Sequence, residues 1–225
     1  MATNTEPTPK LPHSDKSKER WRLSSTMSEL PELVATSKSF SEVAAERRTV
    51  RRLSELELDS TMAIIRMIAL SREIGVGSNK GRHRKLTISA GALHPVEVLI
   101  VSGPAIVEPI IYSDTDDIFG TVTISQLPRF NAEIEGLRTF LPNSSGHFLM
   151  FVGNARHVER SYNDPLSLLW RDAGAMMQMF ALYASAYGFA FVPLGSTGSG
   201  ILESIDSPHE DYLALGTALM GRALP

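Results

Sequence analysis

The chain has 225 residues, 43% hydrophobic and 21% charged, an ordinary globular composition that predicts one substantial hydrophobic core. Its 22 Lys and Arg against 25 Asp and Glu give a net charge of -3, which argues against a general nucleic-acid or anionic-membrane binder. It contains no cysteine, which excludes disulfides, thiolate metal sites and cysteine nucleophiles, so any redox chemistry needs a borrowed cofactor.

The first 24 residues are polar and contain several prolines. They offer too little apolar surface to offset the entropy of ordering, so we expect residues 1–24 to form a tail that is disordered or held by a partner. Residues 25–225 should then form the folded domain. The sequence has neither a signal-peptide core nor a run of about 20 apolar residues, which predicts a soluble, cytoplasmic protein.

Apolar periodicity predicts the elements of the domain. Helices are expected as two short pieces within residues 27–50, and then over residues 59–74, 128–140 and 165–187. The last of these is apolar nearly all round, which predicts a helix buried on every side.

Strands complete the predicted architecture. They are expected over residues 96–103, 109–112, 120–124, 147–152 and 212–219, after a glycine-rich basic loop at residues 75–85. Helices and strands alternate without a regular βαβ repeat, and turns such as Ser113-Asp114 suit antiparallel pairing. The prediction is therefore an α+β fold.

Four arginines gather in the stretch ERRTVRRL, residues 46–53. In a helical or turn geometry Arg47 and Arg51 share a face with Thr49 nearby, so together they would bind one phosphate through charge-assisted hydrogen bonds. The alternative is a solvated basic face that pairs with neighbouring glutamates. Those glutamates are Glu42, Glu46 and Glu55.

Small residues dominate the turn SAGALHP, residues 89–95. Between Ser89 and His94 the backbone is open enough for close approach by a large flat ligand. The alternative is an ordinary loop with a glycine at positive φ and His94 as a satisfied side chain. A second glycine turn, GSTGSG at residues 195–200, has no Lys after its glycines and no βαβ unit before it, so it does not fit the known phosphate loops.

Other kinds of site are not expected. The six histidines form no HExxH motif and no i,i+4 pair, which argues against a metal site. The chain has no GxSxG elbow, which argues against a serine hydrolase.

The motif order resembles a known family. ERRTVRRL and a helix, then SAGALHP with a strand, then RDAGAMMQMFALYASAYGFAFVPLG are similar to the FMN-dependent nitroreductase-like proteins. SAGALHPVEV and DAGAMMQ look most like the SagB-type azoline dehydrogenases, which act in the biosynthesis of ribosomally synthesised, post-translationally modified peptides (RiPPs). The resemblance covers residues 40–221. It implies a nitroreductase-like fold, with a central, mostly antiparallel sheet flanked by helices, in an intertwined homodimer with each FMN in a cleft between subunits.

The resemblance also implies which residues hold FMN. The arginine-rich stretch would bind the phosphate and ribityl chain, and the small residues of SAGALHP would lie against the flavin, because small side chains let the backbone reach its heteroatoms. Gly174, on the core helix, would pack near the cofactor and the dimer interface. The expected cofactor-binding residues are Arg47, Arg48, Thr49, Arg51, Ser89, Ala90, Gly91, Ala92, His94, Gln178, Leu194, Gly195, Ser196 and Arg222.

The chain departs from the family at the expected catalytic pair. Azoline-oxidising members carry a Lys-Tyr pair before the core helix, whereas the segment here, ERSYNDPLSLLWRDAG, has Ser161-Tyr162. Tyr162 and Arg160 are the expected catalytic residues. Arg160 would favour the ionised form of Tyr162 but is no base near neutral pH, and the neighbouring acids, Asp164 and Asp172, could not replace a lysine. The alternative is a surface tyrosine without a role.

Three functions follow from the resemblance. The favoured one is an FMN-dependent dehydrogenase that oxidises thiazoline or oxazoline rings to azoles in a precursor peptide, in complex with a YcaO-type cyclodehydratase. The second is a free-standing NAD(P)H-dependent nitro, quinone or ene reductase. The third is a flavin-free scaffold subunit, which the intact arginine stretch speaks against because an unliganded cluster of like charges is costly.

Overall fold

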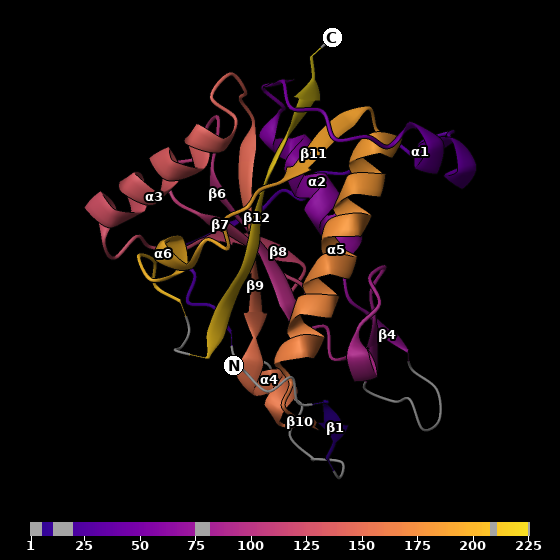
Figure 1. Ribbon diagram of the computed structural model, residues 1–225, viewed down its shortest axis with the longest axis vertical. Coiled ribbons are helices and arrows are strands. Elements are labelled where there is room, and N and C mark those ends of the chain that lie inside the picture. The colour runs from indigo at the N-terminus through magenta and orange to yellow at the C-terminus, as the bar shows by residue number, and fades with distance from the viewer. Residues whose placement is uncertain (1–5, 11–19, 75–81, 208–210, 225) are drawn as a thin grey trace.

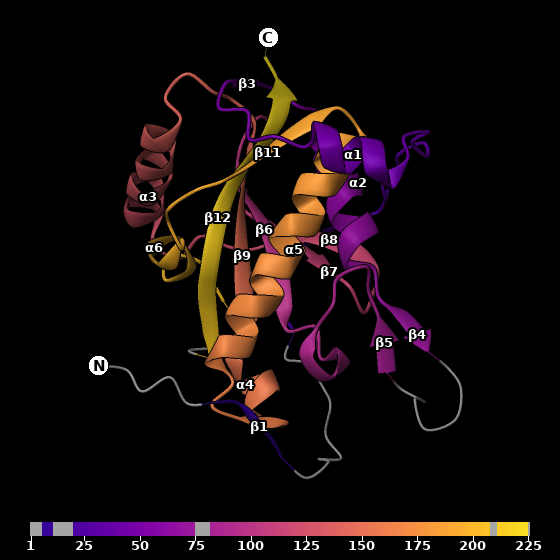
Figure 2. The ribbon, with the colours of Figure 1, turned by 45° about the vertical axis from the view of Figure 1, so that its right-hand side comes forward.

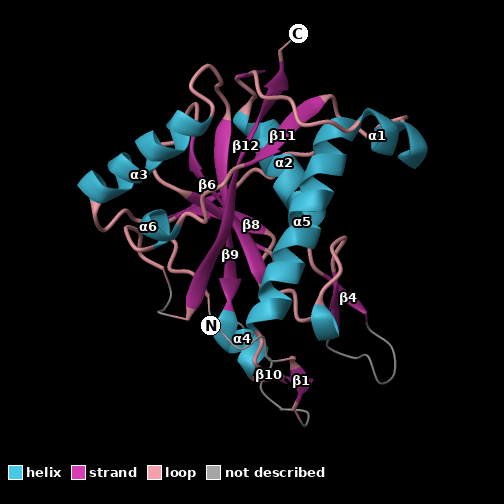
Figure 3. Ribbon diagram, in the orientation of Figure 1, coloured by secondary structure: helices cyan, strands magenta, loops and turns pink. Residues whose placement is uncertain are grey.

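An eight-stranded antiparallel sheet forms the centre of the molecule (Figures 1 and 3). The computed structural model describes residues 6–10, 20–74, 82–207 and 211–224. The strand order is β11-β12-β9-β6-β7-β8-β2, and β3 pairs with the end of β12. These strands are β2 (Ser25–Met27), β3 (Leu53–Ser54), β6 (Val96–Ser102), β7 (Ile110–Ser113), β8 (Ile118–Thr121), β9 (His147–Asn154), β11 (Phe189–Pro193) and β12 (Tyr212–Ala223). Neighbouring strands run antiparallel, which confirms the predicted α+β class.

Helices cover both faces of this sheet. They are α1 (Phe40–Glu46), α2 (Leu58–Ala69), α3 (Leu127–Phe140), α4 (Ala155–Glu159), α5 (Leu166–Ala186), α6 (Ser199–Leu202) and the short 3-10 turn η2 (Ala90–Ala92). α2 and α5 pack on one face, whereas α3 and α6 pack on the other (Figures 1 and 2). Two pairs of short strands lie outside the sheet: β1 (Thr8–Pro9) with β10 (Tyr162–Asn163), and β4 (Arg72–Ile74) with β5 (Arg82–Arg84).

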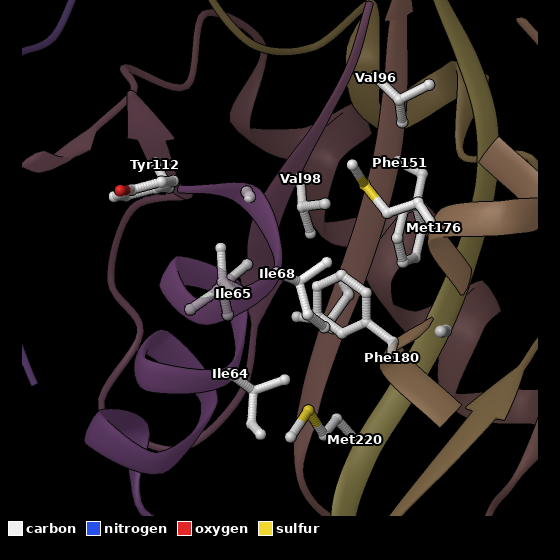
Figure 4. Packing of buried hydrophobic residues seen from close by; sticks show 14 of the residues in the cluster. Ile64, Ile65, Ile68, Val96, Val98, Tyr112, Phe151, Met176, Phe180 and Met220 are labelled. Atoms are coloured by element: carbon white, nitrogen blue, oxygen red, sulfur yellow. The ribbon is translucent and has the colours of Figure 1, made fainter. Parts of the chain in front are cut away.

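The alternation of side chains along β6 divides the core into two clusters. Val96, Val98 and Ile100 belong to the cluster under α2 and α5, and Leu99 and Val101 to the cluster under α3 and α6, as the two-residue period of a strand requires. Because both faces are covered, the strand needs apolar residues at consecutive positions. Figure 4 shows the first cluster, where side chains from α2, α5 and the sheet interdigitate.

The long helix α5 has a buried stripe and an exposed stripe. Its buried residues recur at spacings of three and four, as an amphipathic helix requires. They are Leu168, Leu169, Asp172, Ala173, Met176, Phe180 and Ala184. Trp170, Gly174 and Gln178, spaced four apart, are exposed, so the expectation that this helix is buried on every side is wrong for a single chain. Its bounds agree with the expected 165–187 to within one residue. Among the described residues, no helix has both the length and the apolarity that crossing a bilayer demands.

The N-terminal half departs most from the predicted elements. Only one of the two short helices expected within residues 27–50 forms, because the first piece contains Pro31 and stays irregular. The helix expected over 59–74 ends at Ala69, because Leu70 takes an extended ψ of 123° and the chain continues as β4.

The expected basic loop at 75–85 also differs. Residues 75–81 lie outside the described residues, and the remainder contains β5, which pairs with β4. The expected strand at 120–124 begins two residues earlier, at Ile118, and ends at Thr121, where its hairpin with β7 fixes the register.

The predicted tail, residues 1–24, is described at residues 6–10 and 20–24. In the second piece, Trp21 Nε1 donates a hydrogen bond to Glu97 Oε2 at 2.9 Å. In the first piece, β1 pairs with β10. Both pieces therefore contact the domain.

Candidate functional site

Residues 89–94, which we call the shelf turn, adopt a left-handed turn. Gly91, Ala92 and His94 have φ values of 61°, 54° and 48°, a region that non-glycine residues seldom enter. Ser89 Oγ accepts a hydrogen bond from the His94 backbone N–H at 2.9 Å, which closes the turn. Such conformations persist only where surrounding contacts hold them.

Asp172 of α5 is the contact that holds this turn. Its carboxylate accepts a hydrogen bond from Ser89 Oγ at 2.5 Å and another from the Ala90 backbone N–H. The residue is only 9% exposed. Burial raises the pKa of Asp172, and the two hydrogen bonds oppose that rise. The sequence signal for this role was a carboxylate within an apolar helix, which needs hydrogen-bond partners when it is buried.

Tyr162, one of the two expected catalytic residues, lies against the shelf turn. A Cβ atom added to Gly91 would lie 3.1 Å from Tyr162 Oη and 3.6 Å from its ring, so glycine is what lets the two approach so closely. Arg160, the other expected catalytic residue, is the C-cap of α4 and is partly exposed. The structure thus brings together the shelf turn and Tyr162, which are far apart in the sequence.

Residues 47–52, which we call the clamp segment, follow α1. The helix ends at Glu46, and Arg47 takes ψ 117°, so Arg47 and Arg51 do not share a helix face as the sequence had suggested. Arg48, Thr49 and Arg51 are exposed, and Arg47 is partly exposed.

The charges of the clamp segment lack carboxylate partners. Among the described residues, none of its four arginines forms an ion pair. The glutamate nearest in sequence, Glu46, instead accepts from Lys38 Nζ at 2.7 Å. The contacts do not bear out the alternative of pairing with neighbouring glutamates, and an anionic ligand would relieve the repulsion among these charges.

Arg222, the late phosphate contact, lies at the same end of the molecule as the clamp segment. It is opposite Ser54 in the β3–β12 pair. Its guanidinium donates to Glu57 Oε2 at 2.5 Å and lies 5.6 Å from the ring centre of Phe189. The charge of Arg222 is therefore already paired with a carboxylate.

Leu194, Gly195 and Ser196 lie beside the middle of β12. The Leu194 backbone N–H donates to Thr217 O at 2.9 Å, and Thr217 N–H donates back to Ser196 O at 3.0 Å. Gly195 is exposed, and a Cβ added to it would lie 3.5 Å from Phe140. This turn is fixed to the sheet with one glycine facing outward.

Gly174 and Gln178 point away from the shelf turn. At about 100° per residue, both lie well round α5 from Asp172, which faces the turn. A Cβ added to Gly174 would meet nothing within 4 Å. Both positions are therefore free to face another molecule.

The shelf turn lies beside the amino-terminal half of α5, whereas the clamp segment and Arg222 lie at its carboxyl-terminal end. Of the other expected FMN-binding residues, Gln178 is near the middle of α5, and residues 194–196 lie beside the middle of β12. Asp172, beside the shelf turn, and Ala186, at the end of the helix, are 14 residues apart, which is about 21 Å at 1.5 Å per residue. Arg222 pairs with Phe189, three residues beyond Ala186. In Figure 2, β3 and the C-terminus lie at one end of α5, and α4 and β1 at the other. A single chain does not gather these residues into one site.

A cavity of about 430 Å³ lies elsewhere, between α2, α5 and the β4–β5 pair. Two of its cations have carboxylate partners: Arg66 Nη2 lies 2.8 Å from Asp117, and Lys85 Nζ lies 2.6 Å from Asp114. None of the residues predicted to bind FMN lines this cavity. Among the described residues, no cluster of three or more His, Asp or Glu could hold a metal ion.

Comparison with solved structures identifies the fold. No protein-family model matches the chain, and no curated protein matches it. The chain is similar to a candidate nitroreductase from Ralstonia eutropha, with 18% identity and a TM-score of 0.64 over 99% of this chain and 97% of that chain.

Two further structures agree. One is the E. coli microcin synthetase McbBCD complex with truncated pro-MccB17 bound, with 17% identity and a TM-score of 0.57 over 86% of this chain and 76% of that chain. The other is a candidate NAD(P)H:FMN oxidoreductase from Staphylococcus epidermidis, with 12% identity and a TM-score of 0.54 over 87% of this chain and 92% of that chain. At these identities the likeness establishes the fold, and the predicted nitroreductase-like fold is confirmed.

Proposed function

We propose that the chain is an FMN-dependent oxidoreductase that works as a homodimer and oxidises thiazoline or oxazoline rings in a peptide to azoles. The observation that carries the proposal is the contact between Tyr162 and the shelf turn, at Gly91. A candidate proton acceptor thereby lies beside a candidate flavin platform. The nitroreductase-like fold supports the choice of flavin, and one of the similar structures is a microcin synthetase complex with a peptide bound.

The chain's own residues fit FMN in two respects. The clamp segment offers arginines without carboxylate partners among the described residues, which suits a phosphate. The shelf turn offers small side chains and a glycine, which suit a flat ring. The residues that would hold the group are those predicted from the sequence: Arg47, Arg48, Thr49, Arg51, Ser89, Ala90, Gly91, Ala92, His94, Gln178, Leu194, Gly195, Ser196 and Arg222. FMN, when bound, supplies the two-electron acceptor that ring oxidation needs.

A homodimer reconciles these two groups of residues. The shelf turn and Arg222 lie at opposite ends of α5, and its outer stripe, with Trp170, Gly174 and Gln178, is exposed in the single chain. A two-fold related copy packed on this stripe would set the shelf turn of one chain near the clamp segment of the other, twice over, as a two-fold interface requires. Each half-site would then be completed by the partner.

In this proposal, the side-chain oxygen of Tyr162, in its deprotonated form, receives the proton that leaves the ring carbon, while the two electrons pass to FMN. Tyr162 is partly buried against the first hydrophobic cluster, so its ring is held while its side-chain oxygen lies beside Gly91 of the shelf turn. Arg160 supplies a positive charge two residues before Tyr162, in place of the missing lysine. A YcaO-type cyclodehydratase would make the azoline rings and is the expected partner, together with the precursor peptide.

The second candidate is a free-standing NAD(P)H-dependent reductase of nitro, quinone or ene compounds. The observation that favours it is the absent lysine before Tyr162, because such a reduction does not need a base that deprotonates a ring carbon. The likeness to a candidate NAD(P)H:FMN oxidoreductase is compatible with it.

One experiment separates these functions. The purified chain is loaded with FMN, freed of excess cofactor and mixed without oxygen either with a synthetic peptide that contains one thiazoline or with NADPH. Loss of flavin absorbance with the peptide, together with a thiazole product two mass units lighter, supports the azoline dehydrogenase. Loss of absorbance with NADPH alone supports the reductase. Failure to retain FMN contradicts both.

A further inference from the structure

The first described residues of the chain pair with the strand that carries Tyr162. β1 and β10 form an isolated antiparallel pair in which Pro9 lies opposite Tyr162 and Thr8 opposite Asn163. The Lys10 backbone N–H donates to Ser161 O at 2.8 Å. Figures 1 and 2 show β1 beside α4, at the end of α5 where the shelf turn lies.

The N-terminal strand β1 is weakly held against β10. Thr8 and Pro9 are both exposed. Within the described part of the chain, Lys10 Nζ donates to Glu159 O at 2.6 Å and Asn163 Nδ2 donates to Thr8 Oγ1 at 3.2 Å. Hydrogen bonds of this kind contribute about 1 kcal/mol each, whereas ordering each residue costs about 1–2 kcal/mol. With the bond from the Lys10 N–H, three hydrogen bonds contribute about 3 kcal/mol, against about 3–6 kcal/mol for ordering residues 8–10. These bonds do not exceed the ordering cost, so another extended segment can take the strand's place.

The residue opposite Tyr162 has the chemistry of an azoline. A proline ring includes the backbone nitrogen and Cα and removes the N–H. An azoline, formed when a Cys, Ser or Thr side chain closes on the preceding carbonyl carbon, is also a five-membered ring that contains the backbone nitrogen and Cα and has no N–H. Pro9 therefore places a ring of this kind across from Tyr162, at a position where no N–H donor is needed.

We infer that the edge of β10 that pairs with β1 is the docking site for an extended, azoline-containing peptide, and that residues 8–10 occupy it when no substrate is bound. The inference rests on the proposed function. The substrate ring would take the place of Pro9, beside Tyr162 and the shelf turn, and the next residue's N–H would bond to Ser161 O. Recognition through the backbone by β-strand addition tolerates many side-chain sequences. Glu159 O, at the carboxyl end of α4, further favours a cationic side chain at the position of Lys10.

A reversible cross-link tests this inference. The chain has no cysteine, so Thr8→Cys with Asn163→Cys creates a single possible disulfide between directly opposite residues. Opposite Cα atoms in an antiparallel pair lie about 4.5–5.5 Å apart, within the range that a disulfide spans. The oxidised variant locks β1 on β10, and the reduced variant releases it. Each single-cysteine variant is the control for the substitution itself.

The probe is a fluorescein-labelled peptide with the sequence of residues 6–10 in which a thiazoline ring replaces Pro9, and fluorescence anisotropy reports its binding. We expect the reduced variant and the unmodified chain to bind the probe at least tenfold more tightly than the oxidised variant. Lys10→Ala, which removes the bond to Glu159 O, should tighten binding about threefold, the equivalent of about 0.6 kcal/mol. Equal affinity in the oxidised and reduced states, or no binding in either, overturns the inference.

Flavin absorbance in the same samples tests the proposed function separately. Probe binding that the disulfide controls, without loss of flavin absorbance, would contradict azoline oxidation and leave the docking site standing. Loss of absorbance at equal rates in both states would leave azoline oxidation standing and contradict the docking site.

Discussion

The shelf turn and the clamp segment, near the two ends of α5, differ in how many contacts hold them. At the amino-terminal half of the helix, the shelf turn is fixed: the buried Asp172 accepts two hydrogen bonds from it, and Ser89 closes it. At the carboxyl-terminal end, the clamp segment is irregular and exposed, and its arginines form no ion pair among the described residues. The chain's own hydrogen bonds preorganise the shelf turn, whereas the charges of the clamp segment would be balanced by a bound anion. Changes at the first end should therefore alter stability, and changes at the second should alter ligand binding.

The largest effect is expected where a second copy would join the two ends. Gly174→Glu places a charged side chain on the exposed stripe of α5, in space that is empty in the single chain. We expect light scattering to show a monomer instead of a dimer, and FMN affinity to fall at least 1000-fold, about 4.1 kcal/mol. Gly136→Glu is the matched control, because Gly136 is also a helical glycine with nothing within 4 Å. A Gly174→Glu protein that stays dimeric with bound FMN would contradict the shared site.

The next effect concerns the clamp segment alone. Arg47→Ala with Arg51→Ala should weaken FMN binding by about 3 kcal/mol, roughly 100-fold or more, because each charge-assisted hydrogen bond contributes about 1.5–3 kcal/mol. The free energy of unfolding should change by less than about 0.5 kcal/mol, because the segment is largely exposed. Titration with FMN and urea unfolding measure the two quantities.

Its control is a double change on α3. Arg129→Ala with Arg138→Ala removes two exposed arginines of α3 and should leave FMN affinity unchanged. Equal losses in both double variants would mean that net charge, and not the clamp segment, governs binding.

At the shelf turn we expect a change in the free energy of unfolding, which the clamp variant leaves almost unchanged. Asp172→Ala leaves the Ser89 hydroxyl and the Ala90 N–H without their acceptor, which should lower the free energy of unfolding by about 2 kcal/mol. Urea unfolding of the protein without cofactor gives this number. Arg171→Ala, on the exposed side of the same helix, should change it by less than about 0.5 kcal/mol. Similar values for the two variants would show that Asp172 does not hold the turn.

The elements also differ in how accurately the sequence predicts them. The helices α3 and α5, with their apolar period, and the strand β6, with its continuous apolar run, were predicted to within one or two residues because the pattern of apolar side chains indicates which residues are buried. The two-residue strands β1 and β10 carry no such pattern, and they form only because the folded chain brings them together. Helix-face reasoning also failed at Arg47, because it did not locate the end of α1 at Glu46.

One contact of the candidate site could be predicted from the sequence, but the arrangement of its parts could not. Motif order placed the shelf turn and Tyr162 in one site, and the structure does bring them into contact. Nothing in the spacing indicated that the clamp segment would lie at the far end of α5, because that separation depends on the length of the helix and on the pairing of β12 with β3 and β11. The role of Asp172 was missed for a related reason: its partners are more than 80 residues away in the sequence.

The smallest expected effect is a change in pH dependence at the shelf turn. Burial raises the pKa of Asp172 above its unfolded value, which is about 3.9. From about pH 4 up to the raised pKa, the folded protein binds more protons at this group than the unfolded chain does, so this group's contribution to stability falls as pH rises. Asp172→Asn removes the titration, so urea unfolding from about pH 4 to about pH 7 should show the stability of the unmodified chain decreasing relative to that of the variant. A difference that stays constant or increases with pH would mean that hydrogen bonds from Ser89 and Ala90 outweigh burial, and that the carboxylate is held in its charged form.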